Sequence, residues 1–404
     1  MIRPMPDPQE RIRNLQTICF KLHTLNQEFD QVVGFLDTYI EDLHHLVAAY
    51  PRLSDAHAVL GKWYRSKGEF TQAVIGGHNA LAIDAANLSK QAWLGELLRE
   101  CDDLPALFTE IQPQLLAFHP PYIEIETINV CNAACVMCPA SEKERQAKVM
   151  PLSMFQKIID EVALYPVPPN ISLHGIGEPL LDRQLAERIA YARERRIPYI
   201  AFVSNGSLLT EDKARAVLEA GVSGITVSIE SIHPSVYEPI RVNLKLEEVI
   251  QNVMRLAQLR DQLRPDLSIN VARVTSEENE TEEEAFKQFW RLCLRPGLDR
   301  VFSFPRHNFA GKYPSPFTPG SMPCSKAFSA MNIRSDGTVP LCCVDTSNAY
   351  CFGQVGDRSV LELYNAEAFQ LVRWRQLAGS RSSLPLCGVC NVPEAGEPSV
   401  SSGL

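Results

Sequence analysis

Hydrophobic and polar positions alternate through the middle of the chain in a pattern that predicts strands separated by helices. Ile123, Ile125, Ile128 and Val130 alternate with polar neighbours and indicate a partly buried strand. Five further strands are expected at residues 171–174, 199–203, 224–230, 268–274 and 300–304, with helical periodicity between them. Six strands in alternation with helices predict an α/β barrel, in which the chemistry lies at the C-terminal ends of the strands.

Residues 1–115 have helical character throughout and form the first predicted domain. A pattern similar to a tetratricopeptide repeat lies between residues 55 and 87, and Leu94-Gly95 repeats Leu60-Gly61 at that repeat's period of 34 residues. Small residues in the pattern would let the two helices of a unit pack closely. The region is expected either to offer a groove to a protein partner or to act as a helical cap, on one side of the barrel or in a homodimer.

Composition narrows the classes of function. The 404-residue chain is 45% hydrophobic, has no run of 18 apolar residues and begins without a signal-peptide pattern, so we expect a cytoplasmic globular protein without a membrane segment. Its net charge of −9 argues against nucleic acid as the main partner. Its 12 cysteines, in a chain without an export signal, point to metal or cluster ligands rather than to disulfides.

Three cysteines, Cys131, Cys135 and Cys138, follow the first predicted strand at the spacing C-x3-C-x2-C. Three thiolates so close together can hold three corners of a 4Fe–4S cube and leave the fourth iron open to a small molecule. A structural zinc site is the alternative. Zinc sites normally close with a fourth Cys or His within a few tens of residues, and the next histidine is His174, at the end of another predicted strand.

At these cysteines the sequence resembles the radical S-adenosylmethionine (SAM) enzymes, whose three-cysteine loop follows the first strand of a partial (β/α)6 TIM barrel. The resemblance assigns residues 116–304 to that barrel. It implies that the open iron chelates the amino and carboxylate groups of SAM. An electron from the cluster, supplied by a donor such as flavodoxin or ferredoxin, would then release a 5′-deoxyadenosyl radical. Met137 departs from the family, which usually has an aromatic residue there.

The resemblance also implies contacts to SAM from three strand ends. Gly177 and Glu178 belong to a turn similar to the family's Gly-Gly-Glu-Pro, in which exposed backbone and a carboxylate receive the methionine amino group, although Ile176 stands in place of the first glycine. Ser204 and Asn205 resemble a further strand-end turn.

The remaining SAM contacts are expected in the fourth predicted strand and in the segment that follows it. Ser228 and Glu230 resemble the Ser-x-Asp/Glu segment that hydrogen-bonds the ribose hydroxyls, and Arg241 stands where a family arginine meets the methionine carboxylate. Each short motif is weak alone, and their order behind the three-cysteine loop is what favours this interpretation.

A proline-rich linker, residues 305–323, precedes a second cysteine pattern formed by Cys324, Cys342, Cys387 and Cys390. Its spacing resembles the SPASM domain of radical SAM enzymes in the shorter "twitch" form, as in the 2-deoxy-scyllo-inosamine dehydrogenase class. That resemblance implies one auxiliary 4Fe–4S cluster in a small α+β domain at residues 324–392, and thus two clusters in the protein. A zinc ribbon is the alternative, because two paired-cysteine arms also suit zinc.

Within this domain, residues 330–333 and 338–343 are expected to form a β-hairpin and residues 360–377 a helix, and the Ser/Gly tail at residues 393–404 is expected to be disordered. Cys351 falls in a predicted loop that should face the barrel mouth. Its thiol is therefore a candidate hydrogen-atom donor, and a packed or spare cysteine is the alternative.

The resemblance implies a radical SAM oxidoreductase or epimerase that removes a hydrogen atom from a C–H bond of a sugar, cyclitol or aminoglycoside-like substrate. Oxidation of a carbinol carbon, with the auxiliary cluster accepting an electron, is the first expectation. Epimerisation with a cysteine donor is the second, and maturation of a ribosomal peptide is the third. A helical-repeat adaptor stabilised by zinc is the alternative that is not an enzyme.

Overall fold

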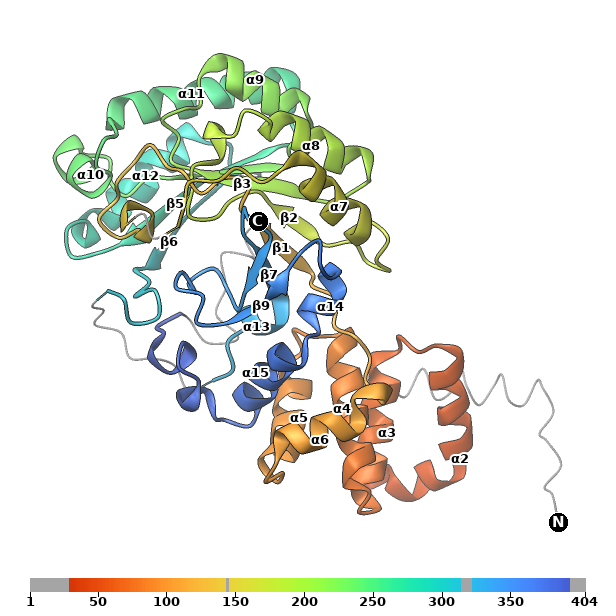
Figure 1. The fold of residues 1–404 in the computed structure, drawn as a ribbon. Coiled ribbons are helices and arrows are strands. Elements are labelled where there is room, and N and C mark those ends of the chain that lie inside the picture. The colour runs from red at the N-terminus through yellow and green to blue at the C-terminus, as the bar shows by residue number, and fades with distance from the viewer. Residues whose placement is uncertain (1–28, 143–144, 314–321, 393–404) are drawn as a thin grey trace, which may run out of the picture.

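The computed structural model describes residues 29–142, 145–313 and 322–392. The expected disordered tail, residues 393–404, lies outside these ranges, as do residues 1–28 and the middle of the proline-rich linker. Figure 1 shows three parts: a barrel of strands and helices, a C-terminal domain in blue below it, and a group of N-terminal helices beside that domain. Within the described ranges, no helix has the length and apolar content needed to cross a membrane.

The barrel contains the six predicted strands, all parallel and paired in sequence order. They are β1 (Tyr122–Ile125), β2 (Asn170–Ser172), β3 (Ile200–Ser204), β4 (Gly224–Ser228), β5 (Ser268–Thr275) and β6 (Arg300–Pro305). A seventh strand, β7 (Ala330–Ile333), pairs parallel with the free edge of β1, so the sheet runs β6-β5-β4-β3-β2-β1-β7. The α/β barrel is confirmed, and the domain after it supplies one of its strands.

Helices cover the outer face of this sheet (Figure 1). They are α7 (Leu152–Val162), α8 (Leu185–Glu194), α9 (Glu211–Glu219), α10 (Pro234–Ile240), α11 (Leu246–Leu263) and α12 (Glu283–Cys293). In α7 the spacing of Phe155, Ile158, Ile159 and Val162 places all four on one face, and all four are fully buried. Burial of each such side chain contributes about 1.5–3 kcal/mol, so this stripe fixes the helix on the sheet.

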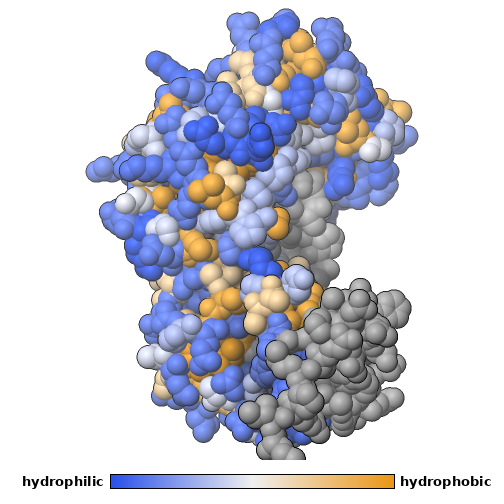
Figure 2. Space-filling view, turned by 90° about the vertical axis from the view of Figure 1, so that its right-hand side faces the viewer, coloured by the Kyte–Doolittle hydropathy of each residue, from blue (hydrophilic) through white to orange (hydrophobic). Residues whose placement is uncertain are grey.

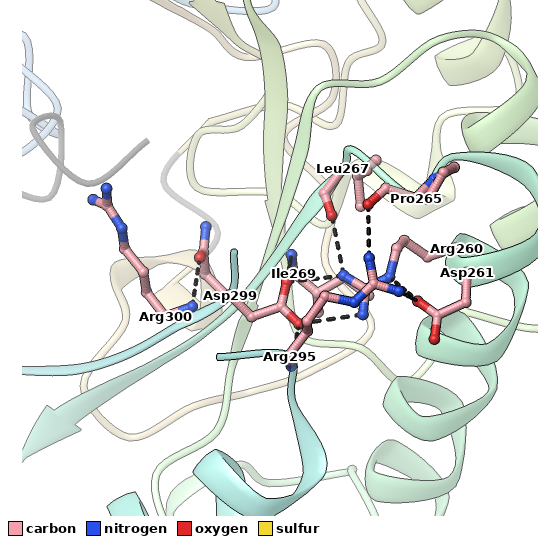
Figure 3. A network of polar contacts seen from close by, with 9 residues as sticks. Arg260, Asp261, Pro265, Leu267, Ile269, Arg295, Asp299 and Arg300 are labelled. Carbon is pink, nitrogen blue, oxygen red and sulfur yellow. Dashed lines mark hydrogen bonds and ion pairs between the residues drawn. The ribbon is translucent and has the colours of Figure 1, made fainter. Parts of the chain in front are cut away.

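A network of polar contacts lies at the N-terminal ends of β5 and β6 (Figure 3). The buried carboxylate of Asp299 accepts hydrogen bonds from Arg260 Nη1 of α11 at 2.9 Å and from the backbone nitrogen of Ile269 in β5 at 2.8 Å. It also accepts one from the backbone nitrogen of Arg295 at 2.8 Å. One buried ion pair thus ties α11, β5 and β6 together at the strand ends opposite the three-cysteine loop.

The predicted β-hairpin at residues 330–343 is wrong in its pairing. β7 joins the barrel sheet, and β8 (Thr338–Pro340) pairs antiparallel with β9 (Cys351–Gln354). A turn does form, because the backbone nitrogen of Arg334 donates to the oxygen of Thr338 at 2.9 Å. The β7–β1 pairing, in contrast, spans all four residues of each strand and is continued by Glu126 N to Ile333 O at 2.8 Å.

The predicted helix at residues 360–377 is two helices, α14 (Val360–Tyr364) and α15 (Glu367–Leu377). The break falls at Asn365. Its side-chain amide donates to the backbone oxygen of Phe118 and accepts from the backbone nitrogen of the same residue, at 2.9 and 2.8 Å. These two hydrogen bonds join the segment before β1 to the chain between α14 and α15. Short helix α13 (Lys326–Ser329) precedes β7.

The N-terminal part is helical as predicted, with α2 (Phe29–Ala49), α3 (Ser54–Ser66), α4 (Phe70–Ile83), α5 (Leu88–Arg99) and α6 (Leu104–Ile111). Helices α3 and α4 cross closely at two glycines, since a Cβ atom on Gly76 would lie 2.5 Å from the Cα atom of Gly61. Helices α5 and α6 pack against α15. The helical region therefore contacts the C-terminal domain through α5 and α6.

Two aromatic side chains anchor these helices to α15. Trp374 Nε1 of α15 donates to His78 Nδ1 of α4 at 3.3 Å, and the rings of Trp374 and Phe108 meet edge to face. The face of the molecule in Figure 2 is mostly hydrophilic, with hydrophobic residues in small separate patches. On this face the hydrophobic residues do not join into one large patch.

Candidate active site

The three cysteines of the first motif lie in the loop after β1, and backbone hydrogen bonds fix this loop against the barrel rim. The nitrogen of Ala134 donates to the oxygen of Val242 at 3.0 Å, in the segment that follows α10. Arg241 Nη1 of the same segment lies 3.4 Å from Cys135 Sγ. The segment after α10 therefore touches the three-cysteine loop through both backbone and side chain.

Burial shapes the chemistry of these thiols. It raises the pKa of Cys131, and it raises the pKa of Cys138 to about 11. Thiols of this kind stay protonated at neutral pH until a cation replaces the proton, so loading of iron would release protons. Among the residues that the structure describes, no three His, Cys, Asp or Glu side chains converge as ligands of one metal ion.

The turn after β2 lies directly against this loop. A Cβ atom on Gly177 would overlap the carbonyl oxygen of Ile128, so glycine is required where the turn crosses the end of β1. The backbone nitrogen of Glu178 donates to the oxygen of Val130 at 2.8 Å, one residue before Cys131. The predicted contact residues Gly177 and Glu178 are therefore placed beside the three-cysteine loop.

The carboxylate of Glu178 is buried and bonded inside the protein. It accepts hydrogen bonds from Ser204 Oγ at 2.8 Å, from the backbone nitrogen of Asn205 at 2.8 Å and from that of Leu180 at 3.1 Å. Burial raises the pKa of Glu178, although these hydrogen bonds act in the opposite direction. The structure thus brings three predicted residues together, and Glu178 holds the turn after β3 in place.

Two polar residues that the sequence analysis did not single out complete this part of the rim. Asn205 Nδ2 donates to Asn132 Oδ1 at 2.9 Å and lies 3.9 Å from Cys131 Sγ. Asn132 in turn donates to Ser207 Oγ at 2.9 Å. Their signal in the sequence was weak, because an Asn inside a cysteine loop and a Ser after Asn-Gly read as ordinary turn residues.

Two further predicted contacts bind each other. Arg241 forms a two-pronged ion pair with the buried carboxylate of Glu230, with Nη2 2.6 Å from Oε1 and a second, shorter contact from Nε to Oε2. Burial alone would lower the pKa of Arg241, but Glu230 and the Cys135 thiol raise it above its usual value. Ser228 ends β4 on the same rim and is half-buried.

The second cysteine set also comes together. Cys324, Cys342, Cys387 and Cys390 line one small pocket in the C-terminal domain, with Cys343 among them. Gln376 of α15 supports it from behind, accepting from the backbone nitrogen of Cys324 at 2.7 Å and donating to Cys387 Sγ at 3.6 Å. Burial raises the pKa of Cys342, and it raises the pKa of Cys387 to about 12.

A cavity of about 190 Å³ connects the two cysteine sets. Cys138 of the first cysteine set and Cys342 and Cys343 of the C-terminal domain all line it. Apolar side chains such as Ile176, Phe309 and Val344 share the lining with polar and charged ones, which are Glu124, Glu126, Arg145, His174, His307, Asn332 and Arg334. Glu124 and Glu126 occupy polar positions in the alternating pattern at β1, and that pattern was used only to predict a strand.

Residues 125–285 match the family model of the radical SAM superfamily, and residues 324–391 match that of an iron–sulfur cluster-binding domain, SPASM. The chain contains a radical SAM domain followed by a SPASM domain. The first implies SAM and a 4Fe–4S cluster, and the second implies an auxiliary iron–sulfur cluster. The enclosed, thiol-lined pocket fits the auxiliary cluster, because thiolates are the ligands of iron–sulfur clusters.

Curated proteins match parts of the chain. A stretch of 184 residues is 25% identical to the tungsten-containing aldehyde ferredoxin oxidoreductase cofactor-modifying protein of Pyrococcus furiosus, covering 45% of this chain and 50% of that protein. Another of 110 residues is 29% identical to the SAM-dependent 2-deoxy-scyllo-inosamine dehydrogenase of Niallia circulans, covering 26% of this chain and 43% of that protein. The chain thus spans half or less of the length of these relatives.

Solved structures share the fold over much of the chain. BtrN in complex with AdoMet and 2-DOIA superposes with a TM-score of 0.50 at 19% identity, covering 69% of this chain and 95% of that one. Streptococcus suis SuiB bound to its precursor peptide SuiA gives 0.52 at 13% identity, covering 80% and 88%. At such identities these matches establish the fold.

The geometry of this radical SAM protein changes one expectation about its thiols. Cys351 lies on β9 with its side chain exposed, and it is not among the residues that line the cavity. Cys343 lines both the cavity and the pocket of the second cysteine set. Cys343 gives no separate signal in the sequence, because it adjoins the ligand candidate Cys342.

A buried carboxylate joins the two domains at the cavity. Glu126 Oε2 lies 2.6 Å from Arg145 Nη2 and accepts from the backbone nitrogen of Ile176 at 3.2 Å. Its Oε1 accepts from Ser335 Oγ, which follows β7, at 3.0 Å. One side chain thus connects the segment after the cysteine loop, the turn after β2 and the SPASM domain.

Proposed function

We propose that this protein is a radical SAM oxidoreductase that oxidises a carbinol carbon of a sugar, cyclitol or aminoglycoside-like molecule. The observation that carries the proposal is the cavity that is lined both by Cys138 and by the pair Cys342 and Cys343. A small substrate there would border both cofactor sites, and the carboxylate, amide, imidazole and guanidinium groups in the mixed lining could orient a molecule that carries several hydroxyl groups. Similarity to a dehydrogenase of a cyclitol-like alcohol supports the same substrate class.

When bound, SAM and the two iron–sulfur clusters would supply the radical that takes the hydrogen atom and an acceptor for the second electron. The residues of the chain would hold the substrate and receive a proton. His174 and His307 line the cavity, and burial lowers the pKa of both, that of His307 to about 4. Neutral imidazole at physiological pH can accept the hydroxyl proton as the carbinol becomes a carbonyl.

The reaction balances in simple terms. The substrate loses one hydrogen atom from carbon, then one proton from oxygen and one electron. The product is a ketone or aldehyde two hydrogens lighter than the substrate. Reduction of the SAM-binding cluster would need an outside electron donor such as flavodoxin or ferredoxin.

Epimerisation is the second candidate, and Cys343 is the observation that favours it. Its thiol borders the cavity, so it could return a hydrogen atom to the opposite face of a substrate radical. Burial raises the pKa of Cys343 to about 12, which keeps the thiol protonated as a hydrogen-atom donor requires. Cys351, the donor expected from the sequence, lacks such a position.

Turnover in heavy water separates the two reactions. Oxidation should give 5′-deoxyadenosine and a product two hydrogens lighter, with no deuterium bound to carbon. Epimerisation should give a product of unchanged composition with one solvent deuterium on the inverted carbon, because a thiol proton exchanges with solvent, and Cys343→Ala should abolish that label. Cys351→Ala is the control and should leave either reaction unchanged.

Iron analysis and SAM cleavage test the class itself. Anaerobically purified protein should contain about eight irons if both clusters are of the 4Fe–4S type. With a strong reductant it should form 5′-deoxyadenosine. Protein that holds both clusters but forms none would contradict the proposal.

A further inference from the structure

Two polar side chains lie next to each other in the cavity on neighbouring strands. Glu124 of β1 and Asn332 of β7 are register partners in the parallel pair, and both line the cavity. Their exposed fractions are 5% and 6%. Register partners in paired strands point to the same side of the sheet, so the two head groups reach the same part of the cavity.

Asn332 has an unused hydrogen-bond donor. Its Nδ2 atom is buried and has no hydrogen-bond partner among the described residues. Buried polar groups in folded proteins are nearly always hydrogen-bonded. An unpartnered amide at the wall of a cavity therefore points to an acceptor atom on a ligand.

Glu124 supplies an acceptor beside it. Its Oε1 lies 3.9 Å from Lys326 Nζ, which is beyond hydrogen-bond length. The carboxylate is thus balanced in charge while its oxygens remain able to accept from a hydroxyl or an ammonium group.

The formal charges in the lining cancel, because the two carboxylates Glu124 and Glu126 face the two guanidinium groups of Arg145 and Arg334. Glu126 is paired with Arg145, and the donors of Arg334 are taken up by neutral acceptors, Asn348 Oδ1 and the backbone oxygen of Asp345. No surplus of cations remains among the described lining residues to attract a phosphate or a carboxylate. This favours a neutral polyol or an amine over an anionic ligand.

We propose that Glu124 and Asn332 are the specificity-determining pair for a vicinal diol or amino alcohol. Glu124 accepts from a hydroxyl or ammonium group, and Asn332 donates to the oxygen on the adjacent carbon. The inference rests on the proposed function, because it takes this cavity as the substrate site. It adds that a SPASM-domain strand, β7, contributes directly to substrate recognition.

Calorimetric titration of the full chain, loaded with clusters and SAM under anaerobic conditions, tests the pair. The probes are 2-deoxy-scyllo-inosamine, which carries an amine, and myo-inositol, which carries only hydroxyls. Asn332→Ala should weaken both probes about tenfold, since each loses one hydrogen bond. Glu124→Gln should weaken the amine by about tenfold or more and the polyol by about threefold or less, because it removes charge and keeps an acceptor.

Met331→Leu is the matched control. This residue lies on the same strand, on the opposite side of the sheet, and the change keeps its volume, so binding should not change. Equal binding in wild type, Glu124→Gln and Asn332→Ala would overturn the inference, as would binding of neither probe to wild type. Formation of 5′-deoxyadenosine without substrate is measured on the same samples. Its absence would count against the proposed function, whereas its presence with unchanged binding would count against the pair alone.

Discussion

Residues in the site are organised through hydrogen bonds that a sequence does not reveal. The order of short motifs identified Glu178, Ser204 and Asn205, and the structure brings all three together. The structure also shows that the Glu178 carboxylate accepts hydrogen bonds from donors within the protein. This arrangement depends on how the turns after β2 and β3 meet. The types of residue could be predicted from the chain, but their mutual contacts required the fold.

Replacement of Glu178 tests its role at this scale. In Glu178→Gln an amide NH2 takes the place of one acceptor, so a donor among Ser204, Leu180 and Asn205 faces another donor. We expect SAM affinity to fall by about tenfold, the cost of about one lost charge-assisted hydrogen bond. Calorimetric titration with SAM measures this loss. Glu194→Gln, an exposed change on α8, is the control, and equal SAM affinity in the two variants would contradict the role.

Helices and strands could be predicted from the hydrophobic pattern where each strand pairs with its neighbour in the sequence. The six strands of the barrel are each adjacent in sequence order, so alternation and turn signals sufficed to find them. Local turn chemistry at Ser335-Asp336-Gly337 predicted a hairpin, but β7 pairs with β1, about two hundred residues earlier. A contact between strands so distant in sequence leaves no periodic signal in the chain. The break between α14 and α15 at Asn365 leaves no such signal either.

The network at the base of the barrel gives a prediction for stability. Asp299→Ala removes the buried charge partner of Arg260 and leaves only the half-exposed Asp261, and loss of a buried partner typically costs about 3 kcal/mol of the free energy of unfolding. Urea denaturation followed by circular dichroism measures the loss. Asp266→Ala removes an exposed ion pair with Arg264 and should cost about 1 kcal/mol or less. Similar losses in the two variants would contradict the importance of the network.

At the scale of the whole molecule, the helical part sits on the SPASM domain. His78 is buried at this contact as a neutral ring, with Nδ1 accepting from Trp374 Nε1 and Nε2 3.2 Å from the backbone oxygen of Leu116. Burial lowers the pKa of His78 to about 3. Protonation would place a second donor against Trp374, so the contact requires the uncharged form.

The stability of this contact should therefore depend on pH. The pKa is lower in the folded state than in the unfolded state, so the stabilisation is complete above about pH 6.5 and is lost as the pH falls toward 3. At pH 5 we expect a loss of about 2 kcal/mol from this residue. Urea unfolding at pH 7.5 and 5.0 measures it. His78→Gln keeps a donor and an acceptor but does not titrate, so its pH dependence should be smaller by that amount, and an equal dependence would contradict the assignment.

The pairing of the SPASM-domain strand β7 with β1 of the barrel has a consequence for synthesis of the chain. Until residues 330–333 leave the ribosome, the outer edge of β1 has no partner, and an open strand edge invites pairing with other chains. A chain shortened after the barrel would keep this unpaired edge permanently, and we expect it to aggregate more readily than the full chain.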